Sequence, residues 1–105
     1  MAKFEYIETP TKDKQYISAD YCFMCPGCGV YHGVWTTNRN DNQAIWQFNG
    51  DVNKPTVSPS LLVRFTPMNG KDAVCHSFIN EGMIQFLSDC THKLANSTVE
   101  LPEIE

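Results

Sequence analysis

The segment YCFMCPGCGVYHGVWT, residues 21–36, places two cysteines on a tight turn between two short apolar stretches. The two residues between Cys25 and Cys28 allow both sulfurs to reach one ion from a single turn. Gly27 and Gly29 relieve the crowding in that turn. The pattern predicts a strand, a knuckle and a second strand, with the knuckle supplying half of a tetrahedral metal site.

A hairpin is the clearest local prediction in the second half of the chain. Residues 75–79 and 83–87 flank the short loop Asn80-Glu81-Gly82, in which Gly82 is suited to a positive φ. We expect two cross-strand pairs, Phe78 with Ile84 and His76 with Phe86. Cys75 then lies at the open end of the hairpin. Beyond it, Asp89 is suited to cap one helical turn over residues 90–95, which Asn96 ends in the left-handed conformation.

These elements bring candidate metal ligands from distant parts of the chain to one place. Four cysteines are our first choice for a zinc site, namely Cys25, Cys28, Cys75 and Cys90. A set in which His92 or His76 replaces Cys75 stays open, and His32 is a further alternate. Cys22 precedes Cys25 by three residues on a strand, which turns its side chain to the opposite face, so we expect a buried thiol there.

Polar residues beside the cysteines are candidates for binding a ligand. They are His32, His76, Asp89, His92 and Arg64. Such groups can bind a second ion, position a ligand or transfer protons. Support of the metal ligands and hydrogen bonding within the hairpin is the simpler interpretation, and we assign no catalytic residue. Arg64 stands out because it interrupts an apolar strand, where it can pair with an acid or face an anion.

The remaining elements are short strands and loops. We expect strands at residues 4–7, 44–48, 61–65 and 99–101, a loop at 9–15 and a turn at 38–42. The stretch 55–59 is extended and contains two prolines, which is typical of a sheet edge. Thr56, Ser58 and Ser60 point one way from it, and we interpret these hydroxyls as a solvated edge rather than a binding site.

The predicted fold is therefore mostly β: a small zinc-stabilised antiparallel sheet, with a zinc-ribbon-like knuckle, a hairpin and one short helix. The 105 residues suffice for one domain, with an N-terminal strand and loop at 1–19 and a metal-binding core at 20–102. Five cysteines, an odd number, cannot all pair in disulfides within one chain. We expect a reducing cytoplasm, in the absence of a secretory signal or membrane-spanning segment.

The net charge of −4 gives no basic footprint for nucleic acid, so a nucleic-acid-binding zinc ribbon is disfavoured. The lysines and arginines of this protein are scattered along the sequence rather than clustered.

Three ordered motifs carry a resemblance to a known family. They are CPGCGVYH, IWQFNGDVNKPTVSPSLLVRF and CHSFINEGMIQFLSDCTHKLANSTVELP. Over residues 20–102 the chain resembles a family of small bacteriophage and prophage proteins often labelled "ammonia monooxygenase". The resemblance implies a phage-encoded, zinc-binding protein in the cytoplasm of the bacterial host and implies no established reaction.

The expected function is a small zinc-binding interaction module that binds a host protein or a small polar ligand, without a membrane. The alternative is a zinc-dependent hydrolase, which needs an open metal position and a base such as Asp89 or a histidine. The chain contains no HExxH or deaminase-type motif for it.

Overall fold

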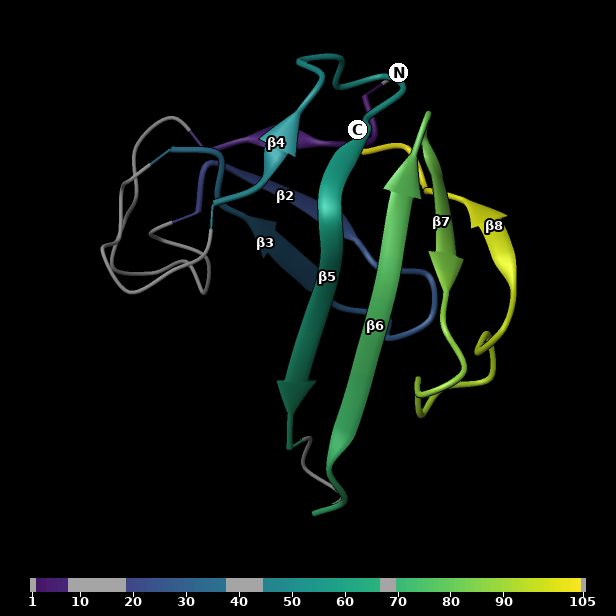
Figure 1. Cartoon of the computed structure of the whole chain (residues 1–105). Coiled ribbons are helices and arrows are strands. Elements are labelled where there is room, and N and C mark those ends of the chain that lie inside the picture. Colours follow the sequence, from purple (N-terminus) through teal and green to yellow (C-terminus); the bar gives the residue numbers. More distant parts are fainter. Residues whose placement is uncertain (1, 8–18, 38–44, 67–69, 105) are drawn as a thin grey trace.

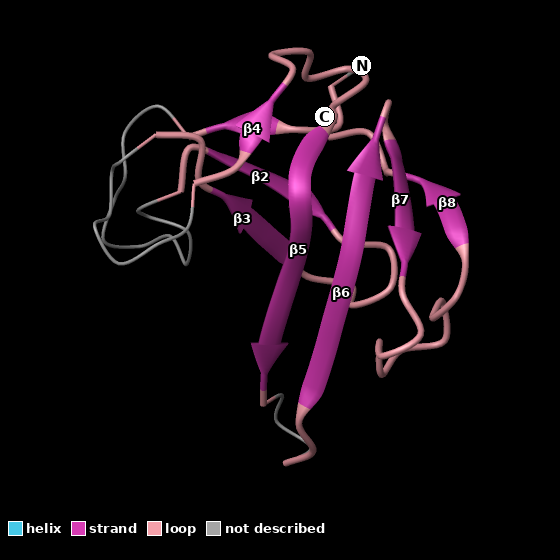
Figure 2. Ribbon diagram, viewed as in Figure 1, coloured by secondary structure: helices cyan, strands magenta, loops and turns pink. Residues whose placement is uncertain are grey.

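The computed structural model describes residues 2–7, 19–37, 45–66 and 70–104, which form eight strands in two antiparallel sheets (Figure 1, Figure 2). The first sheet has the order β1–β2–β3 and the second β4–β5–β6–β7–β8. The strands are β1 Glu5–Tyr6, β2 Tyr21–Met24, β3 Tyr31–Val34, β4 Gln47–Phe48, β5 Val57–Phe65, β6 Ala73–Asn80, β7 Met83–Phe86 and β8 Thr98–Glu100. The mostly β prediction is confirmed, but there are two sheets rather than one. The predicted loop at 9–15 and turn at 38–42 lie outside the described residues.

The knuckle connects β2 and β3 as predicted. Phe23 lies opposite His32 in this pair of strands, and the turn closes with a hydrogen bond from the N–H of Gly29 to the carbonyl of Cys25 (2.8 Å). Gly29 has a φ of 72°, which a glycine adopts without steric cost.

The β6–β7 hairpin is present, but its register differs by one residue from the prediction. Asn80 pairs with Met83, so the turn contains two residues, Glu81 and Gly82, with φ values of 50° and 80°. Two positive φ values in a two-residue loop match the twist of the flanking strands. The shorter loop moves every cross-strand pair, so that Ile79 lies opposite Ile84 and Ser77 opposite Phe86.

The predicted helical turn at residues 90–95 is wrong, because no helix occurs in the described part of the chain. Thr91 N–H instead donates to the carbonyl of Val74 on β6 (3.0 Å), and within the segment Ala95 N–H donates to the carbonyl of His92 (3.3 Å), which closes a single turn. These bonds fix the segment as turns against β6. Asn96 has the expected left-handed conformation, with a φ of 67°.

The core lies between the two sheets, which Figure 1 shows one behind the other. Phe23 and Val34 from the first sheet join one buried cluster with Leu61, Ile79 and Ile84 from the second. Alternation along each strand sends the intervening side chains to the outer face. The outer face of β5 and β6 is therefore available for a functional site. The described residues include no helix that can cross a membrane.

Candidate functional site

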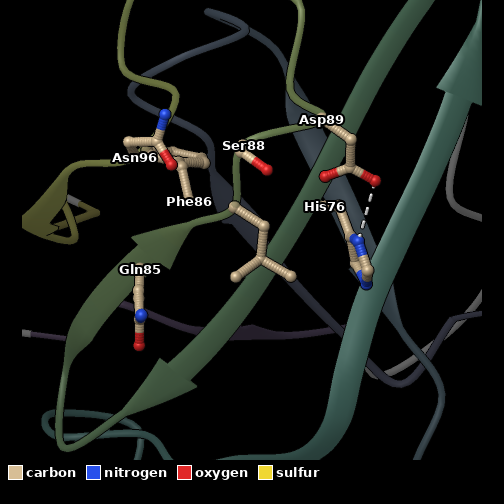
Figure 3. A pocket seen from close by; sticks show the side chains of 7 residues that line it. His76, Gln85, Phe86, Ser88, Asp89 and Asn96 are labelled. Atoms are coloured by element: carbon tan, nitrogen blue, oxygen red, sulfur yellow. Dashed lines mark hydrogen bonds and ion pairs between the residues drawn. The ribbon is translucent and has the colours of Figure 1, made fainter.

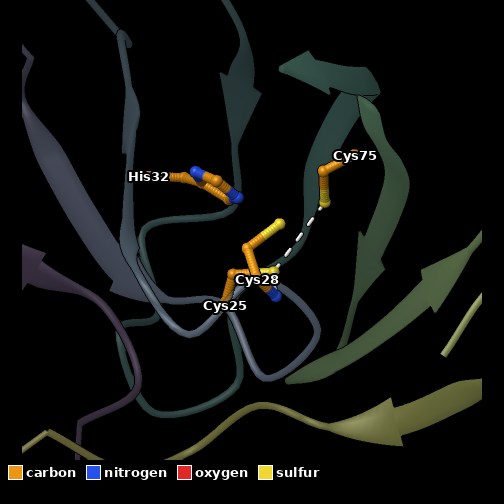
Figure 4. A group of neighbouring side chains, drawn as sticks. All are labelled: Cys25, Cys28, His32 and Cys75. Carbon is orange, nitrogen blue, oxygen red and sulfur yellow. Dashed lines mark hydrogen bonds between the residues drawn. The ribbon is translucent and has the colours of Figure 1, made fainter. Parts of the chain in front are cut away.

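Three cysteines and one histidine gather between the sheets. Cys25, Cys28, His32 and Cys75 each offer one ligand atom, and these atoms all lie within 4.8 Å of one another (Figure 4). We call these four residues the sulfur cluster. The Cys25 and Cys75 sulfurs are 3.8 Å apart, and no disulfide joins them. The backbone N–H of Cys28 donates to the Cys25 sulfur at 3.4 Å. The cluster can hold a metal ion.

The cluster joins the two sheets. The knuckle supplies Cys25 and Cys28, β3 supplies His32, and β6 supplies Cys75. Cys25 and Cys75 are almost fully buried, and His32 is buried as well. Cys25 and Cys75 are 50 residues apart in the chain, so an ion bound by both would connect two distant segments. Metal binding at such a site stabilises the folded state because the unfolded chain does not preform it.

His32 provides an independent test of the fit. Its Nε2 is buried and has no hydrogen-bond partner in the structure. An unsatisfied buried polar atom normally has an explanation such as an ion or a functional role. Coordination of a cation by this nitrogen would satisfy it, and three sulfurs plus one imidazole is a common donor set.

The thiols of the cluster influence one another strongly. Hydrogen bonds from Cys28 and then Cys75 hold the pKa of Cys25 far below its ordinary value. The same hydrogen bonding with Cys25 raises the pKa of Cys28 to about 12 and raises that of Cys75 well above its ordinary value. One thiolate is therefore stabilised by two thiols. A bound cation can stabilise all three thiolates, because it supplies the positive charge that the site lacks.

A second group of donors adjoins the first. Cys75, Cys90 and His92 also place their ligand atoms within 4.8 Å of one another, and the His92 Nε2 is buried without a partner. A Cβ added to Gly27 would come within 2.4 Å of this nitrogen, so glycine is required where the ring packs against the knuckle. Cys75 is common to both groups.

The outer face of the second sheet carries a different constellation, of which Figure 3 shows His76 and Asp89. Ser60 Oγ lies 3.0 Å from His76 Nε2, and His76 Nδ1 lies 3.0 Å from Asp89 Oδ2. We call these three residues the Ser–His–Asp array. With the imidazole proton on Nδ1, the ring donates to Asp89 and accepts from the hydroxyl of Ser60. This sequence of contacts is the one that activates a serine as a nucleophile.

Neighbouring bonds fix the array. His76 N–H donates to the Cys90 sulfur and the Cys90 thiol donates to the His76 carbonyl, both at 3.2 Å. These contacts hold the segment that contains Asp89 against β6. On the other side, the Trp46 indole N–H donates to the Ser60 carbonyl at 3.2 Å. The hydroxyl, the imidazole and the carboxylate of the array thus come from three separate segments of the chain.

The array is open to solvent. The side chains of His76 and Asp89 are 26% and 54% exposed. A hollow of about 520 Å³ adjoins them and is lined by Gln85, Leu87 and Ser88 as well. The hollow therefore gives access to the imidazole and the carboxylate of the array, whereas Ser60 is not part of its lining.

The structure separates the polar residues that the sequence grouped together. His32 and His92 face the sulfurs inside, whereas His76 and Asp89 lie outside with Ser60. Cys25, Cys28 and Cys75 meet as predicted, with the alternate His32. Cys90 lies with Cys75 and His92 in the second group, and its role as a ligand stays a prediction. Cys22 packs with Ile7 and Ala19, away from both groups.

Ser60 is the member of the array whose contact with a histidine the sequence pattern did not indicate. It stands 16 residues from His76, and Asp89 is a further 13 residues on. No short motif surrounds it. The only available signal was the row of hydroxyls at Thr56, Ser58 and Ser60, which also fits a solvated edge.

The fold and the two sites define a small two-sheet β protein that combines a buried sulfur cluster with an exposed Ser–His–Asp array. The chain belongs to the BubE family: the family model described as "bacterial ubiquitination-like system serine protease (BubE)" matches residues 3–87. No curated protein and no solved structure matches the chain.

Proposed function

We propose that this protein is a serine peptidase whose nucleophile is Ser60. The observation that carries the proposal is the pair of 3.0 Å contacts from Ser60 through His76 to Asp89. In this proposal, Ser60 Oγ attacks the carbonyl carbon of a peptide bond and transfers its proton to His76 Nε2. Asp89 orients the ring and stabilises the imidazolium that forms.

The second half of the reaction follows from the same groups. His76 donates the proton from Nε2 to the leaving amine, and an ester between Ser60 and the acyl part of the substrate remains. Water then attacks the carbonyl carbon of this ester while His76 Nε2 accepts a proton from the water. The bond to Ser60 Oγ breaks, the acyl part leaves as a carboxylic acid, and His76 returns the proton to Ser60 Oγ.

The family description supports this reaction class. It calls the family's proteins serine proteases of a bacterial ubiquitination-like system. We infer that the substrate is a protein that belongs to such a system. The match spans residues 3–87 and so includes Ser60 and His76, whereas Asp89 follows two residues later.

We assign zinc to the sulfur cluster, with a structural role. Three thiolates and one imidazole form a closed tetrahedral donor set, in which the protein supplies every ligand. Cys75 and the ring of His32 are buried, so the ion would lie inside the core, on the opposite face of β6 from His76. Zinc in this position holds the sheets together and leaves the reaction to the array.

The two functions expected from the sequence stay predictions. A binding module for a host protein or a small polar ligand needs no array, and a zinc-dependent hydrolase needs an open metal position. The contacts among Ser60, His76 and Asp89 support a serine peptidase more strongly than either of these two functions. Phage origin and residence in the bacterial cytoplasm stay predictions as well.

Labelling with a fluorophosphonate tests the proposal, because this reagent phosphonylates activated serines. We expect the zinc-loaded protein to gain one adduct on Ser60, located by peptide mass spectrometry. Ser60→Ala should abolish labelling, whereas Ser58→Ala, an exposed serine on the same strand, should retain it. Asp89→Asn should slow labelling by roughly 10³–10⁴-fold because the ring loses its orienting acceptor. Equal labelling of Ser60→Ala and the unmodified protein would refute the assignment.

A further inference from the structure

In the described part of the chain, one edge of β5 is unpaired beside the proposed nucleophile. β4 pairs only with Val57 and Ser58, at the start of β5. From Leu61 to Phe65, β5 pairs with β6 on one side. No other described strand pairs with these five residues on the opposite side. Among the described residues, the free edge therefore begins next to Ser60. In Figure 1, β5 extends beyond β4 with β6 beside it.

The register identifies the backbone groups that this edge presents. In β6, His76 and Val74 direct their N–H and carbonyl groups away from β5, toward Cys90 and Thr91. Their partners Leu62 and Arg64 therefore occupy the non-hydrogen-bonded positions of the β5–β6 ladder. The N–H and carbonyl groups of Leu62 and Arg64 consequently point out from the free edge. The Ser60 carbonyl, which accepts from Trp46, points the same way.

A groove runs along this edge. It has a volume of about 280 Å³, and its lining includes Trp35, Trp46, His32 and residues 61–64 of β5. Leu62 is 47% exposed. Arg64 is exposed too and has no ion pair in the described part of the structure. The groove thus offers unpaired backbone groups, apolar walls and one uncompensated positive charge.

We propose that the substrate polypeptide binds as an added strand along Leu61–Phe65, with an acidic side chain beside Arg64. This inference rests on the proposed function and names how its substrate is held. Backbone groups of Leu62 and Arg64 pair with the substrate chain, which gives affinity without regard to sequence. The walls of the groove and Arg64 then select side chains. A strand in this position passes Ser60 at one end, where the scissile bond is attacked.

Cleavage of a defined peptide library measures the selectivity. Synthetic decapeptides of mixed sequence are incubated with the zinc-loaded protein, and the products are identified by mass spectrometry. We expect Asp or Glu to be enriched at one fixed position relative to the cleaved bond. Arg64→Glu should reverse this preference to Lys or Arg at the same position. Lys54→Glu, which makes the same charge change at an exposed residue outside the groove, should leave the preference as it was.

A pair of substitutions at Leu62 tests strand addition itself. Leu62→Ala removes the side chain and keeps the outward N–H, whereas Leu62→Pro removes both. The N–H of Leu62 is not used in the β5–β6 ladder, so proline is tolerated there as on other edge strands. We expect KM for the best library peptide to be about tenfold higher in Leu62→Pro than in Leu62→Ala, as the loss of one hydrogen bond implies.

The possible outcomes separate this inference from the proposed function. If fluorophosphonate labels Ser60 and peptides are cleaved, but without a preference that depends on Arg64 and with equal KM for Leu62→Pro and Leu62→Ala, binding along this edge is overturned and the peptidase assignment stands. Labelling of Ser60 without cleavage of any peptide also overturns this inference, and it leaves Ser60 as an activated serine without the proposed peptidase activity. Absence of both labelling and cleavage overturns both proposals. A dimer in light scattering that Leu62→Pro dissociates would assign the edge to a second copy of the chain instead.

Discussion

Cys75 and His76 are neighbours on β6, yet their side chains lie on opposite faces of the second sheet. Cys75 points inward to the sulfur cluster, and His76 points outward to Ser60 and Asp89. The period of two along a strand produces this arrangement. One peptide unit therefore joins the proposed metal site to the proposed catalytic site.

Substitution of these two neighbours should separate stability from activity. Cys75→Ser should lose the metal and lower the melting temperature by more than about 10 °C. Each kcal/mol shifts that temperature by roughly 4–8 °C in a domain of this size, and a structural metal is worth several kcal/mol. His76→Ala should keep the metal and lose fluorophosphonate labelling. Metal content by mass spectrometry and thermal unfolding provide the check. Retention of full metal and stability by Cys75→Ser would remove Cys75 from the ligand set.

The two buried histidines should differ in their effect on metal binding. His32 completes the sulfur cluster, so His32→Ala should weaken the metal affinity, whereas His92→Ala should leave the ion in place. Cobalt can replace zinc as a spectroscopic probe, and loss of one imidazole ligand changes its visible absorption. His76→Ala serves as the control because His76 belongs to neither donor group. If His92→Ala empties the site and His32→Ala does not, the ion is bound by Cys75, Cys90 and His92 instead.

Metal binding should release protons. The pKa of Cys28 is raised to about 12 and that of Cys75 is also raised, so both thiols are protonated at neutral pH without metal. Coordination needs the thiolates, so each of these two cysteines loses its proton when the ion binds. The apparent affinity should then increase with pH, by roughly 100-fold per unit while both thiols are protonated. Calorimetry in buffers of different ionisation enthalpy measures the protons released. A value near zero would show that the thiols are already ionised.

The tight turn of the β6–β7 hairpin offers a prediction about stability alone. Glu81 has a φ of 50°, a conformation that asparagine adopts more readily. Glu81→Asn should raise the free energy of unfolding by about 0.5–1 kcal/mol. The N–H of residue 81 keeps its bond to Thr56 Oγ1, which is 2.8 Å long. Urea denaturation measures the change.

Gly82→Ala is the matched contrast at the next position. It should destabilise the protein, because Gly82 has a φ of 80° and an added Cβ would lie 3.0 Å from the Lys3 Nζ. A lower stability for Glu81→Asn than for the unmodified protein would contradict the assignment of strain to Glu81.

Local sequence was sufficient for the elements whose geometry depends on a few adjacent residues. The spacing of Cys25 and Cys28 fixed the knuckle, and alternation around residues 80–82 fixed the hairpin. The register of the hairpin could not be derived in the same way. Asn80-Glu81-Gly82 permits a loop of either two or three residues. The structure has the two-residue loop, in which Glu81 N–H donates to the hydroxyl of Thr56, a residue of another segment.

The sequence by itself therefore determined that the chain is mostly β and that a pair of sulfurs lies on one turn, because both depend on spacing along the chain. Only the tertiary structure decided which histidine joins the sulfurs and which one meets a serine. The β5–β6 register and the contact of Cys90 with His76 bring Ser60, His76 and Asp89 together. Contacts between residues so far apart are set by the packing of whole strands, and packing leaves no short motif in the sequence.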